Sequence, residues 1–182
     1  MAVIKTIEAL AIEDDPFSVA VLEHYGTKLS SFKLNIHHTV TLEDSLSFLD
    51  DHREIELIFL DFRVHSKLTG LEMLQHIRAK GINVPVIVVT ASGNEEIAVM
   101  MLKAGASDYL VKGHLSADVL DRSIKGALEQ REIMKDVIGQ DSMLKDMAIK
   151  TSLNGVCMTD LSGNIKYINP SFVSMWGYAK EE

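Results

Sequence analysis

Three acidic side chains occupy positions where a parallel sheet would bring them together. Glu13 and Asp14 follow one short apolar run that is rich in β-branched residues, and Asp61 follows another. Open α/β sheets bind their ligands at the carboxyl ends of their strands. Carboxylates gathered there would repel one another unless a cation lay between them, and a hard divalent ion with oxygen ligands fits best. The pattern therefore predicts a site for Mg²⁺.

Two further side chains follow later apolar runs and complete a possible phosphoryl site. Thr90 offers a hydroxyl donor and Lys112 a cationic ammonium. An aspartate carboxylate can attack phosphorus, while Mg²⁺ and a lysine neutralise the phosphoryl oxygens and a hydroxyl donates to one of them. We predict that Asp61 is the nucleophile. Taken alone, the acidic segment before Pro16 is more typical of a solvated turn and helix cap, so the prediction depends on the five strand ends together.

The segments that must position these residues alternate between two patterns. Short apolar runs predict strands, and stretches with helical periodicity follow each of them. The predicted strands are residues 7–12, 33–37, 57–60, 84–89 and 107–111, and the predicted helices are 17–29, 42–52, 70–80, 95–104 and one that starts near 116. Runs apolar enough to be covered on both faces, in alternation with helices, indicate an α/β fold with a doubly wound, mostly parallel sheet.

The last of these helices is long and amphipathic. Its apolar residues lie three, four or seven positions apart between 116 and 138: Leu120, Ile124, Ala127, Met134 and Ile138. Arg131 stands where a coiled coil would need an apolar residue, so two alternatives stay open for this apolar stripe. It could form a parallel contact with a second helix, or it could pack on its own domain. The second alternative better explains the first two turns of the helix. Gly139, before Gln140-Asp141-Ser142, marks a point where the helix either bends or runs on.

A second fold begins after this helix. Residues 156–159 and 165–168 predict two strands, and the segment between them is typical of a hairpin connection. A hairpin with one short helix buries too little to stand alone, so we expect only the opening part of a domain here. Cys157 lies in the first of these strands, where a lone cysteine is more often a buried small hydrophobe than a cofactor-attachment site.

Composition and charge narrow the class of protein. The chain has 182 residues, of which 47% are hydrophobic and 24% charged, as in folded soluble domains. Its 18 basic and 26 acidic side chains give a net charge of −8, which argues against direct binding to nucleic acid or anionic lipid. A single cysteine excludes an intrachain disulfide, and there is neither a signal-peptide pattern nor a membrane-spanning apolar run. We expect a cytoplasmic protein.

Five segments together resemble the receiver domains of two-component response regulators. They are Ile12-Glu13-Asp14-Asp15-Pro16, Leu60-Asp61, Val89-Thr90-Ala91, Gly105-Ala106-Ser107-Asp108-Tyr109 and Leu110-Val111-Lys112. The resemblance implies a flavodoxin-like sheet of strand order 2-1-3-4-5 and a receiver domain over residues 1–125. It also implies a histidine kinase or phosphotransfer protein as the partner that supplies the phosphoryl group.

The resemblance assigns roles to individual residues. Asp61 would accept the phosphoryl group. The carboxylates of Glu13, Asp14 and Asp61 and the backbone carbonyl of Arg63 would hold Mg²⁺. Thr90 and Lys112 would bind the phosphoryl oxygens. Thr90 would also act in the switch together with Tyr109, whose ring matches the family's aromatic switch position.

Three features depart from the family pattern. The proline usually found four residues after the phosphoacceptor is replaced by His65, and Gly70 comes one residue late, so we expect a differently shaped loop after Asp61. Gly113 stands where the family commonly has a proline in a cis bond, so the orientation of Lys112 could differ from the family's. Arg63 is a cation two residues past Asp61 that could shield the phosphoryl group from water, and it predicts slow hydrolysis.

The C-terminal segment resembles the opening of a PAS domain. The resemblance covers residues 142–182 and rests on the two predicted strands, on Asn169-Pro170 and on Trp176-Gly177-Tyr178. The central helices and last three strands of a PAS fold are absent. Residues 116–141 would then be the last helix and linker, with a possible coiled coil.

Two rival functions remain to be weighed. A phosphatase of the haloacid dehalogenase type also uses an aspartate nucleophile with Mg²⁺, but it needs a second aspartate as general acid where this chain has Arg63, and a guanidinium cannot act as a general acid at neutral pH. A pseudo-receiver that only mediates protein contacts would not need the complete set of strand-end residues. We predict a phosphorelay protein and not a turnover enzyme. Phosphorylation would change its conformation and so control a PAS-linked output. We also expect it to dimerise through its fourth and fifth helices and linker, without direct contacts to nucleic acid or membrane.

Overall fold

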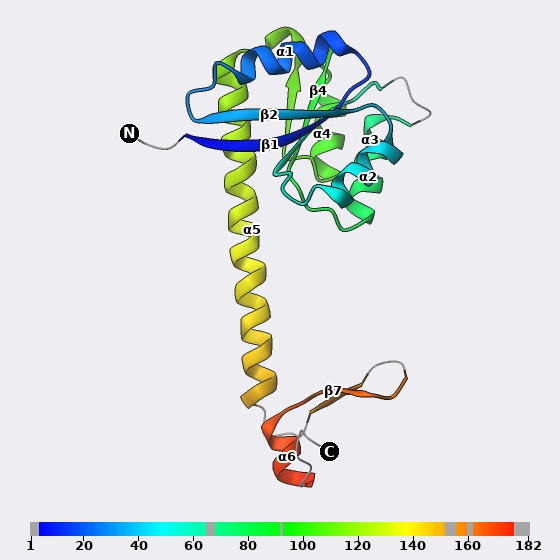
Figure 1. The fold of residues 1–182 in the computed structure, drawn as a ribbon, viewed down its shortest axis with the longest axis vertical. Coiled ribbons are helices and arrows are strands. Elements are labelled where there is room, and N and C mark those ends of the chain that lie inside the picture. Colours follow the sequence, from blue (N-terminus) through cyan, green and yellow to red (C-terminus); the bar gives the residue numbers. More distant parts are fainter. Residues whose placement is uncertain (1–3, 65–67, 92, 152–155, 160–161, 177–182) are drawn as a thin grey trace. The chain divides into compact units, whose positions relative to one another are not determined.

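The structure is a computed structural model of the 182-residue chain, and it describes residues 4–64, 68–91, 93–151, 156–159 and 162–176. The chain divides into two compact units, Met1–Glu132 and Ile133–Glu182. Figure 1 shows the ribbon of both units. The boundary falls inside one helix, α5 (Ala117–Thr151).

The first unit alternates strands and helices from its first strand onward. In chain order the elements are β1 (Lys5–Ile12), α1 (Pro16–Gly26), β2 (Phe32–Thr39), α2 (Leu42–Asp51), β3 (Leu57–Asp61), α3 (Gly70–Ala79), β4 (Val86–Thr90), α4 (Glu95–Lys103), β5 (Asp108–Val111), the short 3-10 helix η1 (Lys112–His114) and α5 (Ala117–Thr151). The predicted elements are all present. The fourth strand begins at Val86, two residues later than predicted, because Pro85 has no N–H to donate to a neighbouring strand.

The strands form one parallel sheet in the order β2-β1-β3-β4-β5, which confirms the predicted order and fold class. Ile12 at the end of β1 is in register with Leu60, the residue before Asp61 at the end of β3. Thr90 at the end of β4 is in register with Val111, the residue before Lys112. The pairing thus aligns the carboxyl ends of four strands at one edge.

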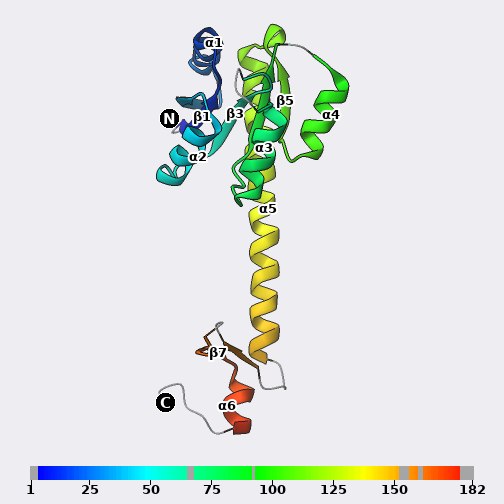
Figure 2. The same cartoon turned by 90° about the vertical axis from the view of Figure 1, so that its right-hand side faces the viewer.

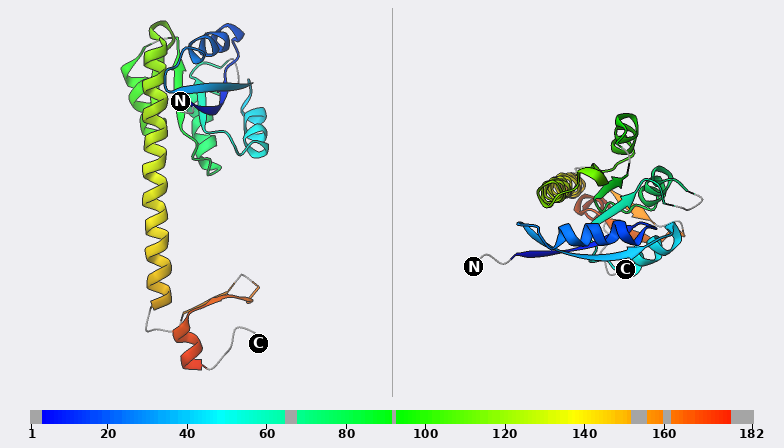
Figure 3. Two further views of the ribbon diagram at one scale, coloured as in Figure 1. Left: turned by 60° about the vertical axis from the view of Figure 1, so that its left-hand side comes forward. Right: turned by 90° about the horizontal axis from the view of Figure 1, so that it is seen from above.

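Each face of the sheet has its own core. In β3 the side chains alternate, so Leu57 and Phe59 join the core that includes α1 and α5, whereas Ile58 and Leu60 join the core that includes α2, α3 and α4. Figure 2 shows α4 next to β5, and the left view of Figure 3 shows α5 passing along one side of the domain while α2 lies on the other. Both faces are covered, as the continuous apolar runs predict.

The start of α5 packs on its own domain. Leu120, Ile124 and Ala127 are buried in the core beside the sheet. Arg131 donates a hydrogen bond of 3.1 Å from its guanidinium to the backbone carbonyl of Glu56, ahead of β3. The arginine that interrupts the coiled-coil seam therefore takes part in the packing of the first unit.

The helix runs on past Gly139 to Thr151 without a break, so of the two alternatives at that point the continuous helix is correct. A glycine inside a helix costs only about 1 kcal/mol, which is too little to end one by itself. Among the helices of the described segments, none combines the length and apolar character needed to cross a membrane.

The second unit contains the predicted hairpin. β6 (Cys157–Thr159) pairs antiparallel with β7 (Ile165–Ile168), and α6 (Pro170–Trp176) follows. Asn169 is fully buried, and its side-chain oxygen accepts hydrogen bonds from the backbone N–H groups of Val156, at 2.8 Å, and Phe172, at 2.9 Å. One side chain thus joins the start of the hairpin to the first turn of α6.

The prediction that Cys157 is buried is wrong, because its side chain is exposed. All three residues of β6 are exposed. A two-stranded sheet with one short helix has too little apolar surface to cover both faces of the hairpin, so a strand-like sequence does not guarantee burial here.

Candidate functional site

The three predicted acidic ligands come together at the carboxyl edge of the sheet. Glu13 and Asp61 are buried and Asp14 is half-buried. One carboxylate oxygen from each lies within 4.8 Å of those of the other two. Because β1 and β3 are neighbours in the sheet, their ends deliver these side chains to one place. Such a group of oxygen donors suits a hard divalent cation such as Mg²⁺.

Lys112 points into this acidic group from the end of β5. Its Nζ donates to Glu13 Oε2 at 2.6 Å and to Asp61 Oδ2 at 3.2 Å. The described residues contain no cis peptide bond, so the Lys112–Gly113 bond is trans. The departure from the family pattern at Gly113 therefore leaves the ammonium directed at the acids.

Burial and charge shift the proton affinities in this cluster. Burial raises the pKa of Glu13, the negative charge of Asp61 adds to that increase, and the hydrogen bond from Lys112 opposes it. For Lys112, burial alone would lower the pKa, but the hydrogen bond to Glu13 and the charges of Asp61 and Glu13 outweigh it, so the net shift is upward. The ammonium is therefore firmly protonated at neutral pH.

Asp15 caps α1, as a helix-cap interpretation of the acidic segment predicts. Its Oδ1 accepts a hydrogen bond of 3.1 Å from the backbone N–H of Phe17. Its Oδ2 accepts one of 2.8 Å from the hydroxyl of Ser18, which in turn lies 2.9 Å from Lys112 Nζ. Sequence reasoning did not identify Ser18. The spacing of three residues from Asp15 could have suggested the cap contact, but no local signal places Ser18 beside Lys112, which is 94 positions away.

His38 is a second residue that sequence reasoning left without a role. Its Nε2 donates to the backbone carbonyl of Glu13 at 2.6 Å, and the N–H of Glu13 donates to the carbonyl of Thr39 at 3.1 Å. The end of β2 thus forms hydrogen bonds with both the N–H and the carbonyl of Glu13. The neighbouring His37 instead pairs with Glu8 at 2.9 Å.

The backbone beside Asp61 fits closely against the start of α3. A Cβ built at Gly70 would lie 2.7 Å from the carbonyl oxygen of Asp61 and 2.7 Å from the Cα of Phe62. The N–H of Gly70 donates to the carbonyl of Phe62 at 3.0 Å. Glycine is therefore required at this position although it comes one residue late. The side chain of Arg63 is exposed, and the position that replaces the family proline, His65, lies outside the described residues.

The two predicted switch residues lie on neighbouring strands. Thr90 is buried at the end of β4. Tyr109 is half-buried on β5 and packs against the core shared with α3 and α4. Register pairs Tyr109 with Val88, two residues before Thr90, and side chains two apart on a strand share a face. The structure thus places Thr90 and Tyr109 on adjacent strands and the same face of the sheet, and the switch role remains a prediction.

The carboxyl edge of this parallel sheet thus carries an acidic cluster with a lysine directed into it. Residues 9–125 match the family model for the response regulator receiver domain, and residues 143–182 match a PAS domain model. The chain belongs to the response regulator receiver domain family, with a PAS segment after the receiver.

Curated relatives are regulators from several bacteria. The chain is 34% identical over 106 residues to the transcriptional regulatory protein MalR of Bacillus subtilis, a match that covers 58% of this chain and 44% of MalR. It is 31% identical over 123 residues to the regulatory protein LuxO of Vibrio cholerae, covering 68% of this chain and 26% of LuxO. A probable C4-dicarboxylate response regulator, DctR of Halalkalibacterium halodurans, matches at 34% over 163 residues, 85% of this chain and 66% of DctR. The chain thus spans under half of the first two relatives.

Solved receiver structures share the fold. The signal receiver domain of a LuxO repressor protein from Vibrio parahaemolyticus superposes with a TM-score of 0.60 at 28% identity, covering 72% of this chain and 97% of that one. NtrX from Brucella abortus superposes with a TM-score of 0.64 at 25% identity, covering 72% of this chain and 29% of NtrX. These matches agree with the family assignment.

Proposed function

We propose that this protein is a phosphorelay receiver that takes a phosphoryl group onto Asp61 from the phosphohistidine of a histidine kinase or phosphotransfer protein. The observation that carries the proposal is the cluster of Glu13, Asp14 and Asp61 with Lys112 directed into it. A carboxylate oxygen of Asp61 forms the new bond to phosphorus, and the bond between phosphorus and the donor histidine nitrogen breaks, with its electron pair left on that nitrogen.

The oxygen donors at the site fit Mg²⁺. We propose that the carboxylates of Glu13, Asp14 and Asp61, together with the backbone carbonyl of Arg63, hold the ion. When bound, Mg²⁺ neutralises charge on the phosphoryl oxygens. Lys112 adds a fixed positive charge on the other side of the carboxylates, and the hydroxyl of Thr90 donates to a phosphoryl oxygen.

The same proposal includes a conformational switch. Phosphorylation at Asp61 shifts an equilibrium between two states, and Thr90 and Tyr109 respond to it. α5 then carries the change toward the PAS segment. In this scheme residues 1–125 form the receiver, 116–141 the last helix and linker, and 142–182 the start of the PAS domain, and the switch controls a PAS-linked downstream output.

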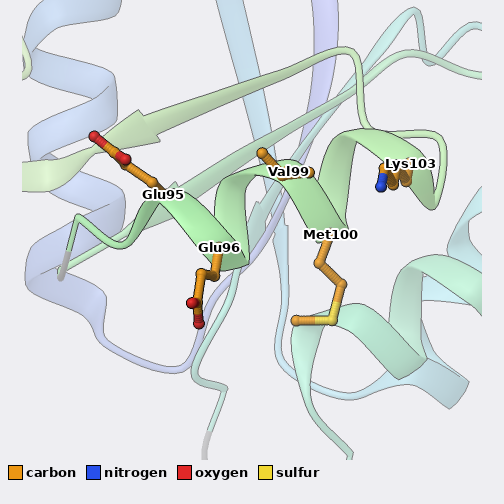
Figure 4. A pocket seen from close by; sticks show the side chains of 5 residues that line it. All are labelled: Glu95, Glu96, Val99, Met100 and Lys103. Atoms are coloured by element: carbon orange, nitrogen blue, oxygen red, sulfur yellow. The ribbon is translucent and has the colours of Figure 1, made fainter.

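We also propose that two copies associate through α4, α5 and the linker. On α4 the exposed apolar side chains include Val99, Met100 and Leu102. A surface hollow on this helix is lined by Glu95, Glu96, Val99, Met100 and Lys103, and Figure 4 shows the acidic residues at its start and the lysine at its end. On α5, beyond the receiver core, Ile133 and Met134 are exposed. The net charge of −8 supports the part of the proposal that excludes direct contact with nucleic acid or membrane, and the single cysteine suits the cytoplasmic location that we propose.

The test is the intact mass after incubation with Mg²⁺ and acetyl phosphate. We expect one labile phosphoryl adduct on the wild-type protein and none on Asp61→Asn. Asp50→Asn is the matched control, because Asp50 is an exposed aspartate that pairs with Arg53. Wild-type protein that acquires no adduct and binds no beryllofluoride would contradict the proposal and favour a pseudo-receiver.

A further inference from the structure

Ser18 makes a contact with Lys112 that the proposed function does not use. It lies in the first turn of α1, where its side chain is 9% exposed. Its hydroxyl lies 2.8 Å from Asp15 Oδ2 and 2.9 Å from Lys112 Nζ. A hydroxyl has one proton to donate. Since neither the carboxylate nor the ammonium can exchange roles, Ser18 donates to Asp15 and accepts from Lys112.

Asp15 sets the direction of the Ser18 hydroxyl. The carboxylate is itself held by the backbone N–H of Phe17, which bonds to its other oxygen. The hydrogen bond from Ser18 lowers the pKa of Asp15, so this carboxylate is an ionised acceptor at neutral pH. The N–H of Phe17 and the hydroxyl of Ser18 thus bind different oxygens of the capping carboxylate. The hydroxyl of Ser18 also reaches Lys112, which lies outside α1, so its contacts extend beyond the helix cap.

The ammonium of Lys112 has three N–H donors, and three acceptors surround it. They are Glu13 Oε2 at 2.6 Å, Ser18 Oγ at 2.9 Å and Asp61 Oδ2 at 3.2 Å. Two of these acceptors, on Glu13 and Ser18, are chemically unchanged when Asp61 becomes an acyl phosphate. The third N–H therefore stays directed at Asp61, where the phosphoryl oxygens arrive.

We propose that Ser18, oriented by Asp15, is a positioning residue that holds the ammonium of Lys112 toward the phosphoryl group on Asp61. This inference rests on the proposed phosphoacceptor function. It also explains how a lysine followed by Gly113 keeps its direction. With Ser18 removed, only Glu13 orients the ammonium once Asp61 is modified, and the charge is less well placed during transfer.

The test compares Ser18→Thr with Ser18→Val, because these two side chains have nearly the same shape and differ in the hydroxyl. We expect Ser18→Val and Ser18→Ala to lower the rate of phosphorylation by acetyl phosphate about tenfold, and Ser18→Thr to restore most of it. The Mg²⁺ concentration at half-maximal rate should stay unchanged, since the oxygen ligands are intact. Ser123→Ala is the matched control, because Ser123 is a buried serine whose hydroxyl donates to Asp108 at the opposite end of β5.

A second measurement reads the contact directly in the unphosphorylated protein. The ¹⁵N-detected ammonium signal of Lys112 should be sharp in the wild type and in Ser18→Thr, and broadened by faster proton exchange in Ser18→Ala and Ser18→Val. Two results would overturn the inference: equal phosphorylation rates in Ser18→Thr and Ser18→Val, or an ammonium signal of Lys112 that is the same in the wild type and in every Ser18 variant. If the wild type accepts no phosphoryl group, the proposed function fails first, and the ammonium signal still decides whether Ser18 holds Lys112.

Discussion

The ammonium of Lys112 lies closer to Glu13, at 2.6 Å, than to Asp61, at 3.2 Å. The pairing with Glu13 stabilises the ammonium, while the contact with Asp61, the proposed phosphoacceptor, is longer. Lys112 is therefore anchored mainly by a residue that phosphorylation does not modify. This relationship leads to the first expectation about the site.

Lys112→Ala should destabilise the protein when no Mg²⁺ is present. It would leave the buried carboxylates of Glu13 and Asp61 without their cation, and breaking a buried pair costs about 3 kcal/mol. Mg²⁺ should recover part of that loss, because it neutralises the same carboxylates. Urea unfolding with and without Mg²⁺ measures both effects. Lys125→Ala is the control, since Lys125 is exposed and its nearest carboxylate oxygen, on Glu129, is 4.0 Å away. Equal losses in the two variants would contradict the assigned role.

Magnesium binding should weaken as the pH falls, beginning above the usual Glu pKa of 4.5, because burial raises the pKa of Glu13. The carboxylate must be ionised to bind the ion, so protonation at a higher pH removes a ligand earlier. In the metal-free protein, the raised pKa of Glu13 has the opposite effect. The stability that it contributes is complete below the pKa of the unfolded state and is lost as the pH rises through the pKa of the folded state. The Mg²⁺ affinity, measured from neutral pH down toward the ordinary glutamate pKa, should depend less on pH in Glu13→Gln than in the wild type, because glutamine has no carboxylate to protonate. The same pH dependence in both proteins would count against this assignment.

Gly70→Ala should destabilise the receiver by about 2 kcal/mol and slow phosphorylation, because the added Cβ would meet the backbone of Asp61 and Phe62 at 2.7 Å. Gly126→Ala should instead stabilise the receiver. Gly126 is exposed on α5, where an added Cβ would meet nothing within 4 Å apart from its neighbours in the same helix, and alanine favours a helix by about 1 kcal/mol. Chemical denaturation of both variants checks the contrast, and a neutral Gly70→Ala would show that the loop after Asp61 shifts without cost.

Arg63→Ala should speed hydrolysis of the phosphorylated protein about threefold, as expected for the loss of an exposed ion pair. The side chain is exposed two residues after Asp61, and the prediction is that its charge shields the phosphoryl group from water. The lifetime of the phosphorylated form, followed by intact mass, measures the effect. Arg53→Ala is the control, because Arg53 is an exposed arginine paired with Asp50 on the surface. An unchanged lifetime in Arg63→Ala would remove the shielding role.

Much of the receiver follows from local patterns in the sequence. Apolar runs such as that before Asp61 are continuous because both faces of β3 are buried, and the alternation of strands with helices allows few other architectures. Local patterns were less informative where packing decides the outcome. Cys157 is exposed although its strand is apolar, and α5 passes Gly139 although the local sequence resembles a helix end.

The sequence by itself determined the fold class, the strand-end acids Glu13, Asp14 and Asp61, and the presence of a cation at Lys112, because these depend on residue type and on short-range periodicity. Only the tertiary structure decided which atoms meet: Ser18 with Lys112, His38 with the backbone of Glu13, and Arg131 with that of Glu56. Each of these contacts joins segments that are far apart along the chain. Their geometry depends on strand order, register and helix packing together, and no local pattern contains that information.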